Sequence, residues 1–304
     1  MLRHIDVCNS KFDGFKDHKT EAGENIYEDI RSYNNNGKGF CISTSNNILS
    51  KCVAWDNVDR DGDEPGEHGD GFAMNDGAEN NRFIECVSYR NSDDGFDTYG
   101  SRRNVFIRCI AYQNGINRLN LNPFAGDGNG FKLGIAFGDE SQAHNIAFRC
   151  LAYNNRLAGF DFNGGAGNYI INCTAYSDKP VEFKNPRTFK MGDRSGLANY
   201  LINNLAYPAP AEEDITDELT RAAQRTNSWN SYTIKTTDLL SLAPNSPNFM
   251  KLSASSPLRN KGTDISQNSA YSEVVSRLIN TDLGYIGLTD LGYIGLPDLG
   301  CFED

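Results

Sequence analysis

Four aspartates and one lysine are the residues of this sequence whose types and spacing could do chemistry. Asp70 stands directly before a Gly-Phe pair, and Asp93 and Asp94 stand directly before the next one. Asp97 follows that second pair, and Lys132 follows a third. Converging carboxylates cannot all ionise cheaply unless a cation joins them. An oxygen-only ligand set favours a hard cation, and flexible geometry favours Ca²⁺ over Mg²⁺. A lysine beside that cation would have a lowered pKa, which suits it to act as a base.

The elements that position these five residues come from a repeat. Gly-Phe occurs six times in the first 160 residues, in a polar, Asn-rich frame. The pairs are Gly14-Phe15, Gly39-Phe40, Gly71-Phe72, Gly95-Phe96, Gly130-Phe131 and Gly159-Phe160. A second strand-like stretch follows each pair. Two such stretches every ~20–35 residues are typical of a solenoid, and the absence of helical periodicity favours a parallel β-helix over 1–207.

The repeat predicts which residues become neighbours. If each Phe points into the solenoid, the residue after it points out. Asp97 and Lys132 then stand on adjacent strands, ~5 Å apart at the backbone. Asp70 and Asp94 are also one strand apart, with Asp93 beside them. Any one aspartate could simply occupy a turn, where Asp is common. The shared register instead predicts a metal site of the four aspartates, with Lys132 on the coil above.

Five cysteines occupy one repeat position, and alternation places them inward. Equivalent β-carbons of in-register strands lie ~4.8 Å apart, slightly beyond the usual disulfide range, so we expect a reduced, buried ladder. The five are Cys52, Cys86, Cys109, Cys150 and Cys173. Their spacing does not match short zinc motifs, and the aspartate patch contains no His or Cys, which argues against zinc.

Composition limits the partners. The chain has 304 residues and a formal net charge of −11, which argues against nucleic acid. That charge also opposes binding of a polyanion unless a cation mediates or the binding face is locally basic. No apolar run approaches the ~18 residues needed to span a membrane. We expect a monomer. The N-terminus lacks a signal-peptide core and reads as a strand already under way, so we expect N-terminal coils and their cap to be missing.

Extra residues between repeats predict loops on one rim of the solenoid, where binding faces usually lie. These loops fall at 57–69, 115–129 and 134–144. From 208 to 304 the repeat stops, and we expect a tail that packs along or caps the solenoid. Short helices are predicted within 211–225, 238–242 and 271–279. Residues 281–288 recur letter for letter at 289–296, which we interpret as a tandem duplication.

Three motifs carry a family resemblance. They are Gly-Asp-Gly-Phe at 69–72, Asn-Ser-Asp-Asp-Gly-Phe-Asp at 91–97 and Gly-Asp-Gly-Asn-Gly-Phe-Lys-Leu-Gly at 126–134. With similar pieces at 145–155, 159–161 and 298–303, the chain resembles polysaccharide lyase family 9, strongly over 30–205. The resemblance implies a right-handed parallel β-helix, a secreted pectate or rhamnogalacturonan lyase, calcium on the four aspartates, and Lys132 as the catalytic base. Phe96 and Thr98-Tyr99 depart from the family pattern, which affects packing more than chemistry.

These observations lead to one main hypothesis and two alternatives. The main hypothesis is a calcium-dependent lyase that cleaves polygalacturonate or rhamnogalacturonan I by β-elimination. Four arginines are candidate contacts for further substrate carboxylates: Arg102, Arg103, Arg149 and Arg156. The first alternative is a non-catalytic carbohydrate-binding β-helix with structural calcium. The second is a β-helix glycoside hydrolase, which would need paired acid and base carboxylates, and the motif order of that class is absent.

Overall fold

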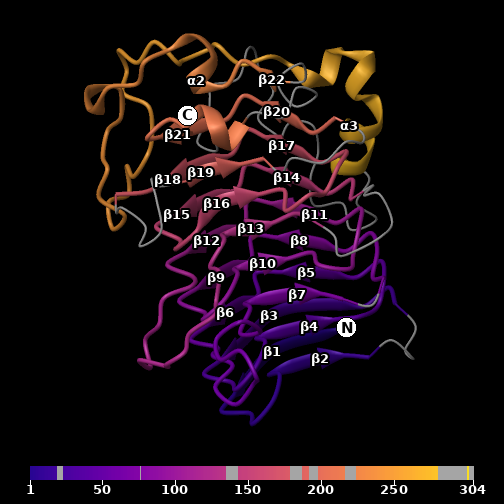
Figure 1. Cartoon of the computed structure of the whole chain (residues 1–304). Coiled ribbons are helices and arrows are strands. Elements are labelled where there is room, and N and C mark those ends of the chain that lie inside the picture. Colours follow the sequence, from indigo (N-terminus) through magenta and orange to yellow (C-terminus); the bar gives the residue numbers. More distant parts are fainter. Residues whose placement is uncertain are drawn as a thin grey trace.

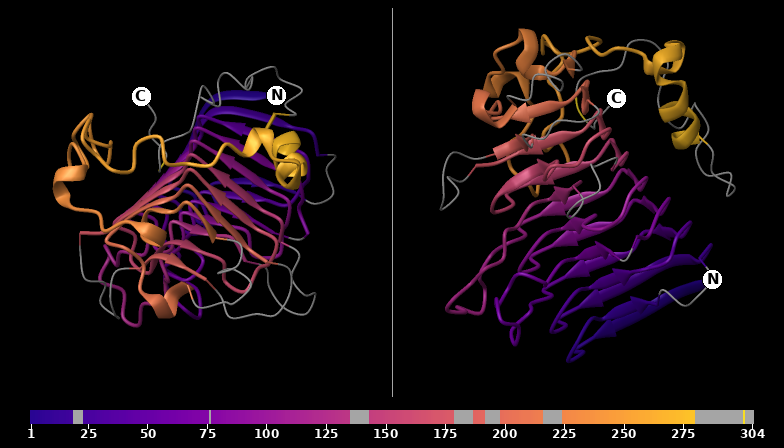
Figure 2. Two further views of the ribbon diagram at one scale, coloured as in Figure 1. Left: turned by 90° about the horizontal axis from the view of Figure 1, so that it is seen from above. Right: turned by 45° about the vertical axis from the view of Figure 1, so that its right-hand side comes forward.

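The body of the molecule is a stack of parallel coils. The computed structural model describes residues 1–18, 23–75, 77–134, 143–178, 187–191, 198–215, 224–279 and 300. Figure 1 shows the coils stacked in sequence order, and Figure 2 shows the same stack from two other directions. Each coil contributes short strands to three faces, and neighbouring strands on every face pair in parallel.

The first face is a separate seven-stranded sheet, which we call the site sheet. Its strands are β2 (Phe15–Asp17), β4 (Phe40–Ile42), β7 (Phe72–Met74), β10 (Phe96–Asp97), β13 (Phe131–Lys132), β16 (Ala158–Asp161) and β19 (Arg187–Lys190). The last of these continues the repeat with Thr188 in place of glycine before Phe189. The sheet therefore extends one coil beyond the Gly-Phe pairs.

The other two faces form one sheet, because the long strand β3 (Ile26–Tyr33) begins both of them. β1 (Leu2–Cys8) pairs with β3 from below. The second face continues with β5 (Ile48–Ser50), β8 (Arg82–Ile84), β11 (Val105–Ile107), β14 (Ile146–Phe148), β17 (Tyr169–Ile171), β20 (Tyr200–Ile202) and β22 (Gln224–Arg225). The third continues with β6 (Val53–Trp55), β9 (Val87–Tyr89), β12 (Ile110–Tyr112), β15 (Leu151–Tyr153), β18 (Thr174–Tyr176) and β21 (Leu205–Tyr207).

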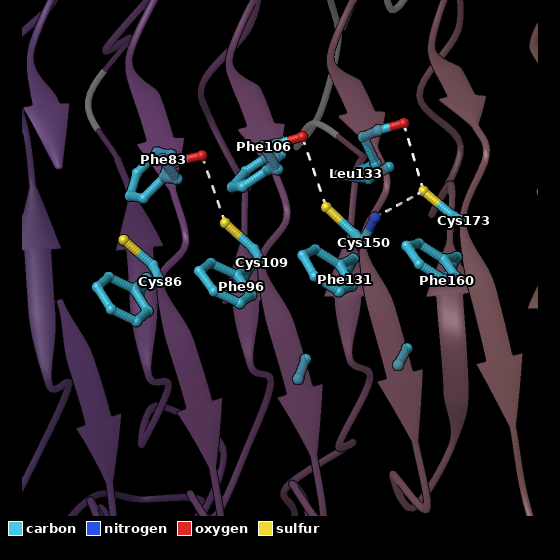
Figure 3. Close-up of a cluster of buried hydrophobic side chains, with 14 of the residues drawn as sticks. Phe83, Cys86, Phe96, Phe106, Cys109, Phe131, Leu133, Cys150, Phe160 and Cys173 are labelled. Atoms are coloured by element: carbon cyan, nitrogen blue, oxygen red, sulfur yellow. Dashed lines mark hydrogen bonds between the residues drawn. The ribbon is translucent and has the colours of Figure 1, made fainter. Parts of the chain in front are cut away.

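Two ladders of buried side chains run through the core (Figure 3). The phenylalanines of the site sheet stack ring on ring from Phe40 to Phe189, with centroids 4.5–5.1 Å apart. The five repeat cysteines are fully buried free thiols. The predicted reduced ladder is confirmed. Both ladders hold the coils in register, because each inward side chain packs on its equivalent one strand away.

An asparagine ladder fixes the corner from which the site sheet begins. Asn57 Nδ2 donates to Asn91 Oδ1 at 2.9 Å, and Asn91 Nδ2 donates to Asn114 Oδ1 at 3.0 Å. These side chains are fully buried, so each needs such a partner. Asn91 lies two residues before Asp93, so the ladder also fixes the height of the turn that carries Asp93 and Asp94.

The tail packs against the outside of the solenoid. The helix α3 (Ser272–Ile279) buries Val274 and Leu278 on the outer residues of β11, β14, β17 and β20. Residues 239–258 contribute Leu239, Phe249 and Leu252 to a second cluster, on the outside of β15, β18 and β21. Trp229 of α2 (Ser228–Ser231) packs on Phe189 near the end of the core.

One of the three helices predicted in the tail is confirmed, and the other two are wrong. The helix over 271–279 is confirmed by α3. A single helix over 211–225 is wrong, because Gln224–Arg225 form β22 and the described helical turn is only η1 (Glu212–Ile215). A helix over 238–242 is also wrong. The turn η2 (Thr236–Asp238) ends there, and Leu239 pairs with Leu252 and turns its side chain to the solenoid, so tertiary packing overrides local preference.

Two predicted features lie outside the described residues, namely the duplication over 281–296 and most of the loop over 134–144. Within the described residues, no helix has the length and apolar character needed to cross a membrane.

Candidate active site

The predicted register around the aspartates and the lysine is confirmed. Phe96 pairs with Phe72 on one side and with Phe131 on the other. The same pairing sets Asp97 opposite Lys132. At Gly95, before Phe96, the close approach of the coils requires glycine. A Cβ on Gly95 would lie only 2.6 Å from the carbonyl oxygen of Gly130.

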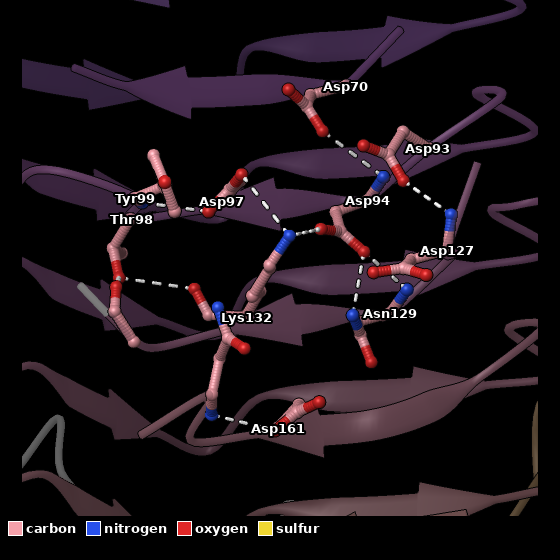
Figure 4. Close-up of polar contacts among 12 residues, drawn as sticks. Asp70, Asp93, Asp94, Asp97, Thr98, Tyr99, Asp127, Asn129, Lys132 and Asp161 are labelled. Carbon is pink, nitrogen blue, oxygen red and sulfur yellow. Dashed lines mark hydrogen bonds and ion pairs between the residues drawn. The ribbon is translucent and has the colours of Figure 1, made fainter. Parts of the chain in front are cut away.

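Three of the four aspartates form a compact cluster (Figure 4). One carboxylate oxygen from each of Asp70, Asp93 and Asp94 lies within 4.8 Å of the others. Their exposed fractions are 2%, 3% and 0%, so the cluster is almost closed to solvent. We call these three residues the aspartate trio. Asp97 stands beside the trio and faces Lys132.

Each carboxylate of the trio is oriented by a donor from the next coil. The backbone NH of Asp94 donates to Asp70 Oδ1 at 3.2 Å, and that of Asp127 donates to Asp93 Oδ1 at 2.7 Å. Asn129 donates twice to Asp94 Oδ1, from its backbone NH at 2.6 Å and from Nδ2 at 2.9 Å. These bonds fix the carboxylates before any ligand arrives.

The trio suits a hard cation. Asn129 Oδ1 is a buried oxygen that accepts no hydrogen bond from the residues the structure describes, and buried Asp94 Oδ2 is held there by the ammonium group of Lys132. Burial raises the pKa of Asp70 to about 8, although the charge of Lys38 opposes the shift. Burial, and then the charges of Asp94 and Asp70, raise the pKa of Asp93 well above its ordinary value. Close acids that ionise with difficulty become favourable ligands once a dication neutralises them, and all the donors here are oxygens.

Lys132 lies against these acids. Its Nζ is 3.0 Å from Asp94 Oδ2 and 3.8 Å from Asp97 Oδ2, and its side chain is 14% exposed. Burial alone would lower the pKa of Lys132, but the charges of Asp94 and Asp97 outweigh it and raise the pKa. The lowered pKa expected for a base therefore depends on a bound cation. Burial also raises the pKa of Asp97 to about 6, and Lys132 opposes that shift.

Sequence reasoning missed two lysines on this sheet. Lys38 Nζ lies 3.8 Å from Asp70 Oδ2 and 3.4 Å from the carbonyl oxygen of His68. Lys190 Nζ lies 2.6 Å from Asp161 Oδ2 on the coils beyond Lys132. A signal existed for each. Lys38 takes the position before Gly-Phe that Asp70 and Asp94 take, and Lys190 follows Phe189 as Lys132 follows Phe131.

The loops over 57–69 and 115–129 lie beside the trio and bind each other. The NH of Ala125 donates to the carbonyl of Pro65 at 2.9 Å. Arg156 supports the second loop, since its Nη1 donates to the carbonyl of Gly126 and its guanidinium lies 5.1 Å from the ring centroid of Phe124. The loop segment 126–129, which supplies the donors to Asp93 and Asp94, is thereby anchored.

The other three arginines considered as substrate contacts lie elsewhere. Arg102 and Arg103 lie beyond the opposite end of β10, where they pair with Glu79 and Glu273. Arg149 lies in the turn between β14 and β15, with its guanidinium over the ring of Phe148. All four arginines are charged residues in similar polar stretches of the sequence, so the sequence did not indicate which corner of the coil each one occupies.

Comparison with known proteins gives consistent likenesses. A family model described as the Pel9A-like right-handed β-helix region matches residues 1–200. Pectate lyase L of Dickeya dadantii is 30% identical over 272 residues, which are 83% of this chain and 60% of that protein. Pectate lyase PEL9 of Emericella nidulans is 35% identical over 188 residues, covering 54% of this chain and 45% of that protein. The chain thus spans about 60% or less of the length of these curated relatives.

Solved structures agree on the architecture. The crystal structure of pectate lyase Pel9A matches with a TM-score of 0.71 and 28% identity, over 98% of this chain and 69% of that one. A rhamnogalacturonan lyase matches with a TM-score of 0.57 and 24% identity, over 83% of this chain and 69% of that one, a likeness of fold alone. The predicted all-β, right-handed parallel β-helix is confirmed.

Proposed function

Because the chain belongs to the Pel9A-like right-handed β-helix family, we propose that it is a calcium-dependent polysaccharide lyase that cleaves an acidic pectic polysaccharide by β-elimination. The substrate would be polygalacturonate or rhamnogalacturonan I. One observation carries the proposal beyond family membership: the register places Lys132 Nζ 3.0 Å from a carboxylate of the buried aspartate trio. The residues proposed to bind the cation and the residue proposed to accept the proton would thus be side by side, which supports an elimination of this kind.

The trio would hold the calcium, with Asp97 and the buried Oδ1 of Asn129 beside it. When bound, a divalent cation supplies positive charge that attracts a uronate carboxylate and makes the neighbouring C5 proton more acidic. This answers the difficulty posed by the net charge of −11, because the acidic protein then presents a cationic centre to an acidic polymer.

Lys132 would serve as the base. Its Nζ takes the proton from C5 of the uronate, and the electron pair of that C–H bond forms the C4–C5 double bond. The bond from C4 to the glycosidic oxygen breaks, and that oxygen takes a proton from solvent. The base must be neutral to act. Without a cation, Asp94 and Asp97 raise the pKa of Lys132. Their effect on this pKa would become smaller once a cation neutralises their charge.

Product analysis tests the proposal. Polygalacturonate or rhamnogalacturonan I with Ca²⁺ should give rising ultraviolet absorbance from the unsaturated uronate, and EDTA should abolish it. Saturated reducing ends alone would indicate a hydrolase and overturn the lyase assignment. Binding without cleavage would favour the non-catalytic carbohydrate-binding alternative. Because pectic polysaccharides belong to plant cell walls, we also propose that the protein works outside the cell that makes it.

A further inference from the structure

Three lysines of the site sheet differ in how firmly they are held. Lys132 lies 3.0 Å from Asp94, and Lys190 lies 2.6 Å from Asp161. Lys38 has longer contacts, 3.8 Å to Asp70 and 3.4 Å to the carbonyl of His68, although its side chain is only 18% exposed. A charge-assisted hydrogen bond is usually ~2.7–2.9 Å, and an ammonium group has three donors. Lys38 therefore keeps donor capacity for a further anionic ligand.

The position of Lys38 relative to the trio is set by the register. The NH of Gly39 donates to the carbonyl of Asp70 at 2.8 Å, and Phe40 pairs with Phe72. Lys38 thus lies one strand from Asp70, on the N-terminal side of the trio. Lys132 lies on the C-terminal side. The two ammonium groups flank the trio along the axis of the solenoid.

This arrangement disfavours binding of a dication to the trio by itself and favours its binding together with an anion at Lys38. A dication on the trio would stand beside the like charge of Lys38, which now faces Asp70. An incoming carboxylate at Lys38 would remove that repulsion and use its remaining donors. On the basis of the proposed function, we propose that Lys38 binds a second uronate carboxylate of the polysaccharide, one coil toward the N-terminus from the trio, and so couples substrate binding to calcium binding. The polysaccharide then crosses the strands of the site sheet along the solenoid axis.

Coupling of this kind is reciprocal, so it can be measured without turnover. Calcium binding to the wild-type protein is followed by calorimetry, with and without the unsaturated oligouronide that the enzyme releases as product. We expect the oligouronide to tighten calcium binding about fivefold or more. Lys38→Gln should bind calcium alone about threefold to tenfold more tightly than wild type, because a like charge is gone. It should also lose the effect of the oligouronide, with a KM for polygalacturonate raised about tenfold and a kcat little changed.

Two further variants separate this role from a structural one. Lys38→Arg keeps the charge and should keep most of the coupling. Lys16 lies on the same sheet, 54% exposed and 3.6 Å from Asp13, so Lys16→Gln should match wild type in every measurement. Wild-type coupling and KM in Lys38→Gln would overturn the inference, as would weaker calcium binding in that variant. Failure of the wild type itself to bind calcium or to form unsaturated product would overturn the proposed function and this inference together.

Discussion

Asp97 and Lys132 are cross-strand neighbours: Asp97 ends β10, Lys132 ends β13, and Lys132 Nζ lies 3.8 Å from Asp97 Oδ2. Both residues follow a stacked phenylalanine, so the ring ladder in the core determines the pairing outside it. A displacement of one residue in either strand would turn one of the two side chains inward. The chemistry of the site therefore depends on the packing of the core.

Replacing the proposed base should abolish turnover and spare the metal. Lys132→Ala should lower kcat by at least about a thousandfold. Lys132 Nζ lies 3.0 Å from Asp94, and in the described part of the chain no other lysine lies as close to the trio. Calcium affinity should be retained or increased, since a like charge is removed. The readouts are ultraviolet absorbance of the product and calcium calorimetry. The exposed Lys235→Ala is the matched control, and an active Lys132→Ala would remove this residue from the mechanism.

Neutralising one member of the trio should weaken calcium binding directly. Asp94→Asn keeps an Oδ1 that can accept from Asn129 but loses the charge. We expect calcium affinity to fall by about tenfold to a hundredfold or more, as for a lost ligand charge in a carboxylate site. At a hundredfold excess over Kd, calcium should also raise the free energy of unfolding of the wild type by about 2.7 kcal/mol, seen as a higher Tm, and should do so far less in the variant. Equal calcium affinity in the two proteins would rule out the trio as the site.

Arg156 should affect calcium affinity although it contacts the loop over 115–129 and not the trio itself. It holds the carbonyl of Gly126 beside the NH of Asp127, which orients Asp93. In Arg156→Met the segment loses this anchor, and calcium affinity should fall about tenfold, as for other groups that position metal ligands. Arg149→Met is the control, because Arg149 packs over Phe148 on another face. If both variants bind calcium as wild type does, the loop is held without Arg156.

Much of the solenoid and of its site could be predicted from the sequence, for a physical reason. A repeat that stacks in register converts sequence position into spatial position, so the Phe and Cys ladders and the pairing of Asp97 with Lys132 followed from spacing alone. The site residues that escaped prediction carry weaker signals. An isolated Lys38 before glycine resembles an ordinary solvated charge. Lys190 follows a unit in which Thr188 replaces glycine, so the repeat appeared to have ended.

Other features depend on contacts that no local pattern encodes. The donors to Asp93 and Asp94 include backbone NH groups of Asp127 and Asn129, a group that every residue except proline possesses. The direction in which these NH groups point depends on how the loops over 57–69 and 115–129 pack together. The strand-like pairing of Leu239 with Leu252 likewise depends on the outer face of the solenoid, where their side chains are buried. The prediction of a helix there was wrong because local helix propensity does not include contacts with the outer face of the solenoid.

The stability of the calcium-free protein should fall as the pH rises from about 5 to about 8. Folding raises the pKa of Asp70 from 3.8 to about 8, and that of Asp97 from 3.8 to about 6. Between these values the folded state binds more protons than the unfolded state, so the free energy of unfolding decreases with rising pH. Lys132 and Lys38 have raised pKa values too, but they stay protonated in both states across this window, so their contribution is constant.

Urea denaturation in EDTA at pH 5 and pH 8 measures this slope, which we expect to be on the order of a few kcal/mol. Asp70→Asn should make this slope smaller, with Asp93 and Asp97 still contributing to it, whereas Asp63→Asn, at an exposed loop residue, should leave it unchanged. Saturating calcium should cancel or reverse the fall, because the metal binds the deprotonated carboxylates and its affinity rises with pH. Stability that rises between pH 5 and pH 8 in EDTA would show that the buried acids are already ionised and stabilised by Lys38 and Lys132 without a metal.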